Sequence, residues 1–109
     1  MNYTIEYKKD VTLTLDEGDR KGSGTLVTKS TSENECNFVM ISDSFRKAMI
    51  PFLEKDFSDC TITHRNNIND VKVEEAIRNA DVLVIATIER YDSSLVQSVD
   101  KIINILSAG

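Results

Sequence analysis

The sequence lacks most of what several functional classes require. Its 109 residues carry 13 Lys and Arg against 18 Asp and Glu, a net charge of −5, and the basic residues do not cluster as they do on a nucleic-acid surface. No apolar run approaches the roughly 18 residues that a membrane-spanning helix needs. With no targeting segment and a length suited to a single core, the chain is expected to be one globular domain or part of one.

Cysteine and glycine are also scarce, with two and four residues respectively. Two cysteines are too few for a metal site without further soft ligands or histidines at suitable spacing. Residues 22–24 (GSG) are not followed by a helical pattern, so they do not form a phosphate-binding loop. We therefore expect neither a metal nor a cofactor.

The two cysteines themselves leave two alternatives open. Cys36 and Cys60 each directly precede an expected strand. If the two strands are parallel neighbours, both thiols lie at the same edge, and a Cys36–Cys60 disulfide is geometrically possible. Two reduced, partly buried cysteines are the other reading.

Residues 1–35 have the pattern of a β and loop segment. Apolar and polar residues alternate from Tyr3 to Tyr7 and again from Val11 to Leu15, which is typical of half-buried strands. Residues 16–24 have the composition of a turn or mobile loop, and residues 25–29 favour another short strand. We expect this segment to lie at the edge of the core, or to be the tail of a preceding part of the domain.

Residues 36–109 alternate between strands and helices. Apolar runs predict strands at 38–41, 61–64 and 82–88, and the last run, VLVIATI, is typical of a central parallel strand covered on both faces. The simplest architecture is a three-layer α/β/α fold with a small parallel sheet of order 2-1-3 and an extra N-terminal β segment. Ligands bind such sheets at the carboxyl edge of the strands, where Ser44, residues 64–66 and residues 89–91 are expected to meet.

A helix is expected after each of these strands. The first spans residues 45–53, and Pro51 predicts a kink or break near Ile50. The second spans 71–80, with Asn69 or Asp70 as its cap, and the third begins at Asp92 or Ser93. The apolar stripe expected to face the core on the third helix consists of Leu95, Val96, Val99, Ile102, Ile103 and Leu106.

The junction between the first expected strand and the helix after it has the pattern of a nucleophile site. In α/β acyl-transfer enzymes the nucleophilic serine lies in the turn between a strand and a helix. The start of that helix offers free N–H groups and partial positive charge to an oxyanion. Ser44 occupies that place, although serine is also a common helix cap. His64 is the single histidine and so the one internal candidate for a base, but no acid is clearly placed to orient it.

Three parts of the sequence resemble the SGNH/GDSL hydrolase superfamily: ISDSF at 41–45, PFL at 51–53 and ERY at 89–91. The similarity covers about residues 37–92 and is greatest to the alginate O-acetylation-like branch. It implies that Ser44 is the acyl-accepting serine and that Asp43 is the aspartate of the block, which is not the triad acid. Candidate oxyanion or substrate-binding residues are Ser42, Asp43, Asn66 and Arg90, the last either ion-paired to Glu89 or facing an acidic sugar.

The chain departs from this family in two respects. Ser42 stands where the block usually has glycine, and neither the upstream Asp-x-His nor the C-terminal Asp-x-x-His of such enzymes is present. The resemblance therefore implies the carboxyl-terminal portion (36–109) of a carbohydrate esterase or O-acetyltransferase, inactive alone, from an extracytoplasmic parent protein. Its partners would be a carbohydrate substrate or the remainder of the parent polypeptide.

Other functions remain as alternatives. The same fold could serve as a non-catalytic polysaccharide-binding or interaction module that has lost the chemistry. A receiver-like domain fits less well, because no aspartate ends the strand at 82–88. A sugar phosphotransferase B-type domain fits less well too, because its reactive cysteine follows the first strand whereas Cys36 precedes it.

Overall fold

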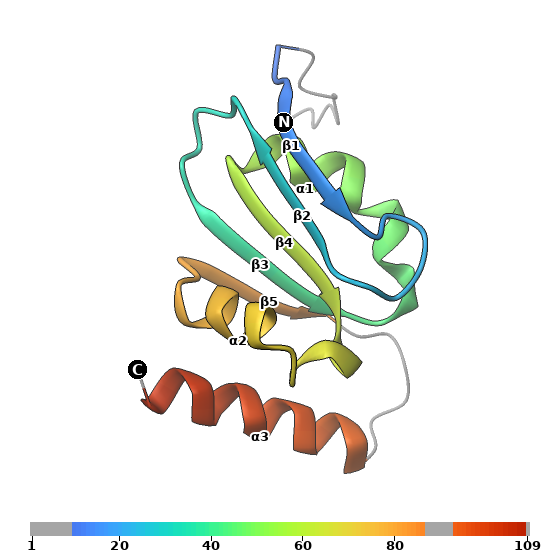
Figure 1. Cartoon of the computed structure of the whole chain (residues 1–109), viewed down its shortest axis with the longest axis vertical. Helices are drawn as coiled ribbons and strands as arrows, with labels where there is room; N and C mark the ends of the chain where they lie inside the picture. The colour runs from blue at the N-terminus through green and yellow to red at the C-terminus, as the bar shows by residue number, and fades with distance from the viewer. Residues whose placement is uncertain (1–9, 87–92, 109) are drawn as a thin grey trace, which may run out of the picture.

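The structure, a computed structural model, describes residues 10–86 and 93–108 (Figure 1). Its centre is a five-stranded mixed sheet of order β1-β2-β4-β3-β5. β3 is parallel to both β4 and β5, whereas β2 is antiparallel to β4 and to β1. The expected α/β class is confirmed. The strands are β1 (Leu13–Gly18), β2 (Leu26–Ser30), β3 (Asn37–Ser42), β4 (Asp59–His64) and β5 (Val82–Ala86).

Helices lie on both faces of this sheet because successive side chains of β3 point to opposite sides. Met40 packs with Ile50 of the helix α1 (Ile50–Asp56) on one face. Val39 and Ile41 pack on the other face with the helices α2 (Val71–Arg78) and α3 (Ser93–Ala108). The α2 and α3 side is held by seven buried residues: Val39, Ile41, Ile68, Val73, Ile77, Ile102 and Ile105.

The prediction that the run at 82–88 is a central strand is wrong. β3 lies between β4 and β5, so the middle position belongs to the strand at 37–42, and β5 is at the edge of the described sheet. Val82 and Ile85 are 41% and 39% exposed. A continuous apolar run indicates that both faces of a strand can be buried, but it does not indicate whether the strand has a neighbouring strand on one side or on both.

The N-terminal segment forms the opposite edge of the sheet, as expected. β2 pairs with β4 and carries β1 on its outer side. The predicted loop at 16–24 is wrong for its first three residues, which belong to β1; the loop comprises residues 19–25. Gly18 ends the strand at φ +107, and a Cβ there would lie 2.0 Å from the Thr25 oxygen, so a glycine is required. The strand expected at Tyr3–Tyr7 lies outside the described residues.

The first expected helix is interrupted. A 3₁₀ helix, η1 (Ser44–Ala48), precedes α1, and Pro51 sits in the first turn of α1, where its missing N–H costs nothing. The predicted break near Ile50 is thus confirmed, and the prediction of an α-helix starting at residue 45 is wrong. α2 begins as expected, because the Asp70 carboxylate accepts a 2.8 Å hydrogen bond from the Lys72 N–H.

The apolar stripe of α3 is only partly buried. Leu95 and Ile102 face the core together with Ile105, which the sequence pattern did not single out. Of the other four residues of the predicted stripe, Val99 is half-buried, and three are exposed: Val96 by 37%, Ile103 by 53% and Leu106 by 51%. The apolar arc of this helix is therefore wider than the face that the rest of the domain covers.

The two cysteines are both free. Cys60 does not precede its strand as expected but lies inside β4, where its thiol donates a hydrogen bond to the Leu53 carbonyl over 3.1 Å. Burial raises the pKa of the Cys60 thiol to about 12. Cys36 and Cys60 are therefore reduced, and the Cys60 thiol is protonated and unreactive near neutral pH.

Candidate functional site

The backbone of Ser44 lies at the carboxyl end of the parallel strands. β3 ends at Ser42 and η1 begins at Ser44, two residues later. The Ser44 side chain is outside the described part of the structure. The helix that follows is a five-residue 3₁₀ turn instead of the expected α-helix, so little of an α-helix dipole is available at this position. A 3₁₀ turn still leaves its first N–H groups without intrahelical partners.

The two residues before Ser44 are buried. Ser42 is 2% exposed, and its buried hydroxyl donates to the Asp43 carbonyl over 3.2 Å. Asp43 is fully buried, and its carboxylate lies 3.2 Å from Arg65 Nε. Since Asp43 follows β3 and Arg65 follows β4, this ion pair ties together the carboxyl ends of neighbouring strands and fixes the backbone on which Ser44 stands.

His64 does not have the arrangement of a catalytic base. It ends β4 opposite Ser42, and its Nδ1 accepts a 3.1 Å hydrogen bond from the Asn66 N–H. A neutral imidazole with an accepting Nδ1 carries its proton on Nε2. A serine base of the usual type needs the reverse, with Nδ1–H held by an acid and Nε2 free to accept. His64 thus serves here as the cap of a short 3₁₀ helix, η2 (Arg65–Asn67).

Arg46 is the residue that sequence reasoning missed. Its side chain is 1% exposed although it carries a positive charge. The guanidinium donates to the carbonyl oxygens of Asp19 (2.7 Å), Gly22 (3.1 Å), Gly24 and Ile62 (3.1 Å). Burial lowers the pKa of Arg46, and the charge of Asp19 opposes that shift. One side chain therefore fastens η1 to both the loop 19–25 and β4.

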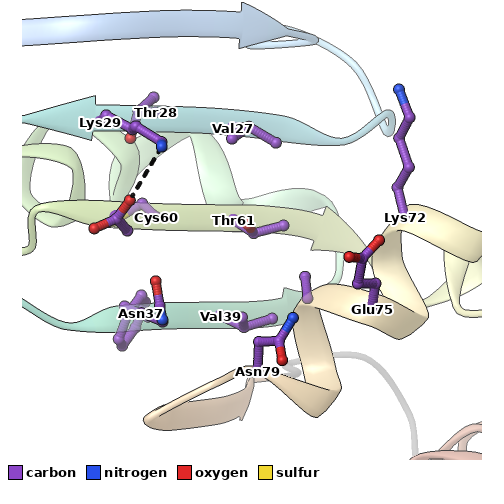
Figure 2. A pocket seen from close by; sticks show the side chains of 13 residues that line it. Val27, Thr28, Lys29, Asn37, Val39, Cys60, Thr61, Lys72, Glu75 and Asn79 are labelled. Atoms are coloured by element: carbon purple, nitrogen blue, oxygen red, sulfur yellow. Dashed lines mark ion pairs between the residues drawn. The ribbon is translucent and has the colours of Figure 1, made fainter.

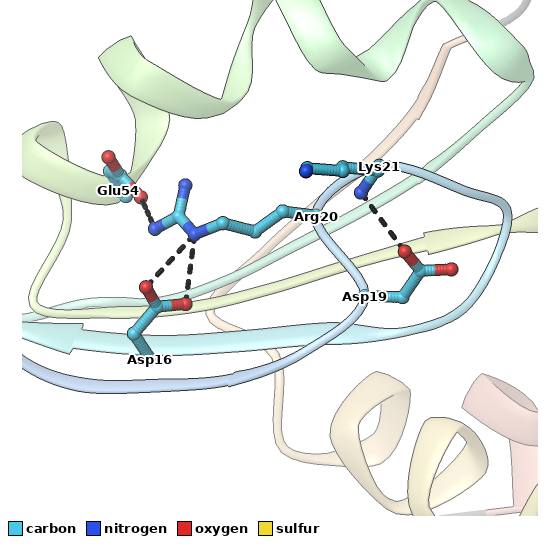
Figure 3. Close-up of polar contacts among 5 residues, drawn as sticks. All are labelled: Asp16, Asp19, Arg20, Lys21 and Glu54. Atoms are coloured by element: carbon cyan, nitrogen blue, oxygen red, sulfur yellow. Dashed lines mark hydrogen bonds and ion pairs between the residues drawn. The ribbon is translucent and has the colours of Figure 1, made fainter.

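Asp19 stabilises the loop 19–25 through hydrogen bonds to the backbone of that loop. Its carboxylate accepts N–H groups of Lys21 (3.0 Å), Gly22 (2.7 Å) and Gly24 (2.9 Å), and these hydrogen bonds lower the pKa of Asp19. Figure 3 shows this contact beside a second anchor, in which Arg20 binds Asp16 at 2.9 Å and also contacts Glu54 of α1. No local sequence signal marks this arrangement, because Arg46 lies more than 20 residues after the loop whose carbonyl groups it binds.

A polar cavity of about 310 Å³ opens at the carboxyl end of β4, between η2 and α3. The basic residues of the described lining are Arg65 and Lys101, and the Arg65 charge is already paired with Asp43. Asn66 is exposed and lines this cavity, whereas Arg90 lies outside the described residues. The cavity is lined by Arg65, Asn66, Ile68, Asn69, Gln97, Ser98 and Lys101.

A second cavity, of about 400 Å³, lies at the other end of the strands. Figure 2 shows it on the sheet face beside α2, bordered by Asn37 and Val39 of β3, by Glu75 of α2 and by Asn79, which follows that helix. Lys29 and Asp59, which both line the cavity, form an ion pair at 3.8 Å. Residues 64–66 are not among the described residues that line this cavity.

Neither cavity contains a metal-binding cluster, since no three His, Cys, Asp or Glu side chains converge within residues 10–86 and 93–108. In the same part of the chain, no helix has the length and apolar character to cross a membrane. Comparison with protein-family models, curated proteins and solved structures finds no match. Any assignment of function must therefore depend on the geometry of the site and on the resemblance of its residues.

Proposed function

We propose that this chain is the carboxyl-terminal portion of an SGNH-like carbohydrate esterase or O-acetyltransferase domain, with Ser44 at the nucleophile position. Ser44 would attack the acyl carbonyl carbon, a histidine from outside this chain would take its proton, and the same histidine would then protonate the departing oxygen. The parent protein would act outside the cytoplasm on a polysaccharide. The chain by itself is inactive in this proposal.

The observation that carries the proposal is the position of Ser44 two residues after the end of β3, the strand between two parallel neighbours. In open α/β sheets this end of the strands is where ligands bind. The surroundings are held rigidly by the Asp43–Arg65 pair and by the four carbonyl contacts of Arg46. Such reinforcement suits a nucleophile, whose reactivity depends on accurate placement.

The need for an external base follows from His64. Its Nδ1 is occupied as an acceptor, so the neutral ring presents a proton instead of a lone pair on Nε2. The sequence holds no second histidine. A complete triad would therefore require a histidine, with an acid to orient it, from another segment of the parent polypeptide.

A serine-directed fluorophosphonate probe tests the proposal in the full-length parent protein. We expect covalent labelling that maps to Ser44 and disappears in Ser44→Ala, while Ser98→Ala, which removes a serine from the wall of the neighbouring cavity, remains labelled. The isolated chain should react at least about a hundredfold more slowly, since it lacks the general base. Absence of labelling at Ser44 in the full-length protein would reject the proposal.

A second candidate is a non-catalytic module that binds polysaccharide. It is favoured by the cavity at the end of β4, whose described lining brings Lys101 together with Arg65 and several amide or hydroxyl groups. In this case the full-length protein would bind an acidic oligosaccharide with unchanged affinity after Ser44→Ala, and Lys101→Gln would weaken that binding.

A further inference from the structure

We propose that Asp19 is a positioning residue for Ser44, acting through the loop 19–25 and Arg46 on the backbone of η1. This role rests on the proposed function, in which Ser44 is the nucleophile. The N-terminal hairpin β1–β2, which carries the loop, then belongs to the reacting site and is not only the edge of the core.

The loop 19–25 lies at the same edge of the sheet as the backbone of Ser44. Leu26 follows the loop directly and is paired with Ile62, two residues before the end of β4. β3 and β4 are parallel and end opposite each other, and η1 begins two residues after β3. The hairpin therefore brings its turn to the carboxyl ends of the parallel strands.

η1 has little local support of its own. It is a five-residue 3₁₀ helix, whose hydrogen bonds have poorer geometry than those of an α-helix. Its N-cap residue, Asp43, makes no capping hydrogen bond to it with the side chain, which pairs instead with Arg65. Arg46 provides support from outside the helix, and three of its four carbonyl partners belong to the loop 19–25. The position of η1 therefore depends on the shape of that loop.

Asp19 sets the shape of the loop on the side that Arg46 binds. Gly22 and Gly24 each donate their N–H to the Asp19 carboxylate and each offer their carbonyl oxygen to Arg46. The backbone carbonyl of Asp19 accepts a third hydrogen bond from Arg46. A Cβ on Gly22 would lie 2.6 Å from Asp19 Oδ2, so a side chain at that position would displace the carboxylate. The loop thus connects the carboxylate to the guanidinium through its own peptide groups.

Two further contacts hold the loop to the core independently of Arg46. The Asn67 side chain of η2 donates to the Ser23 carbonyl over 2.7 Å. The Thr25 hydroxyl shares a 2.8 Å hydrogen bond with the hydroxyl of Thr63, which lies in β4. Loss of the Asp19 carboxylate would therefore change the middle of the loop without detaching it from the sheet, and η1 would move with the carbonyl groups that it follows.

The kinetics of fluorophosphonate labelling at Ser44 in the full-length parent protein test this role. Asp19→Ala should lower the maximal rate constant at least about tenfold and leave the probe concentration for half-maximal rate unchanged, because a misplaced nucleophile reacts more slowly although the probe still binds. Asp19→Asn keeps the oxygen that accepts the Lys21 and Gly22 N–H groups and should react faster than Asp19→Ala. The matched control is Glu17→Ala, at an exposed acid of β1, which should react like the wild type.

Gly22→Ala provides a second test that removes no charge, since it displaces the Asp19 carboxylate by contact; it should lower the maximal rate constant as Asp19→Ala does. Unchanged rate constants in both variants, with the wild type labelled, would overturn the role of Asp19 and leave the proposed function standing. So would a smaller amount of labelled protein at an unchanged rate constant, which is the effect of lost stability alone. A wild type that is not labelled at Ser44 would reject the proposed function and this role together.

Discussion

The two ends of β3 and β4 are built from different chemistry. At the amino end the buried residues are Phe38 and Cys60, and the Phe38 ring stacks on Phe57 with centroids 4.3 Å apart. At the carboxyl end the buried residues include Asp43 and Arg46, both charged. Apolar packing tolerates small adjustments, whereas a buried polar group must keep its partners. The carboxyl end should therefore be the more sensitive to single substitutions, and the more accurately fixed.

The largest effect is expected for Arg46→Met. The change removes the donor shared by four carbonyl groups and detaches the loop 19–25 from η1. We expect the free energy of unfolding to fall by about 4 kcal/mol, since each buried unsatisfied group costs on the order of 1–3 kcal/mol. Urea denaturation measures it, with Lys47→Met on the exposed side of η1 as the matched control. Equal effects of the two variants would contradict the role assigned to Arg46.

Asp43→Asn should follow in size. It removes the negative charge beside Arg65, whose side chain is 13% exposed. We expect a loss of about 2–3 kcal/mol in the free energy of unfolding, somewhat below the value for a fully buried pair. In a double-mutant cycle with Arg65→Gln, the double variant should be more stable than the sum of the single effects predicts; strict additivity would show that the two side chains do not interact.

Phe57→Ala tests the apolar packing at the amino end of β3 and β4. Phe57 is half-buried and its ring lies 5° from parallel to that of Phe38. We expect a loss of about 2 kcal/mol, less than for a fully buried phenylalanine, and Phe57→Leu should recover more than half of it. Thermal or urea unfolding of both variants gives the comparison. A larger loss here than for Arg46→Met would reverse the order of the two ends.

The smallest effect concerns acid stability. Because the folded protein lowers the pKa of Asp19 below its ordinary value of 3.8, Asp19 stabilises the fold above that pH, and this contribution is lost as the pH falls through the lower pKa of the folded state. Asp19→Asn should therefore lower stability at pH 5 and make it less dependent on pH below 3.8. Asp10→Asn, at an exposed acid, is the control. Parallel pH profiles for wild type and Asp19→Asn would refute this role.

Much of the fold could be predicted from local pattern. The cap at Asp70, the break caused by Pro51 and the alternation of strands and helices depend on residues close together in sequence. For β5 two sequence indications disagreed: the order 2-1-3 put the strand at 82–88 at an edge, whereas its continuous apolar run indicated a central strand, and the neighbours that decide between them are not encoded locally. The exposure of half of the apolar stripe of α3 could not be predicted for a similar reason. The stripe can be located from the sequence, but the sequence does not show how much of it packs against the rest of the domain.

The candidate site was predictable in place but not in detail. The break between β3 and the following helix locates Ser44 from the sequence alone. The pairing of Asp43 with Arg65 joins residues 22 positions apart, and Arg46 reaches carbonyl groups of a loop more than 20 residues earlier. Such contacts depend on the register between strands, which local periodicity does not encode.

Trapping of an acyl-enzyme tests the central claim most directly. The full-length parent protein would be incubated with an activated acetyl ester, quenched in acid and digested, and the peptides would be analysed by mass spectrometry. We predict one acetyl group on Ser44 that is absent in Ser44→Ala. Acetyl groups found on lysines or other serines, with the Ser44 peptide unmodified, would contradict the account.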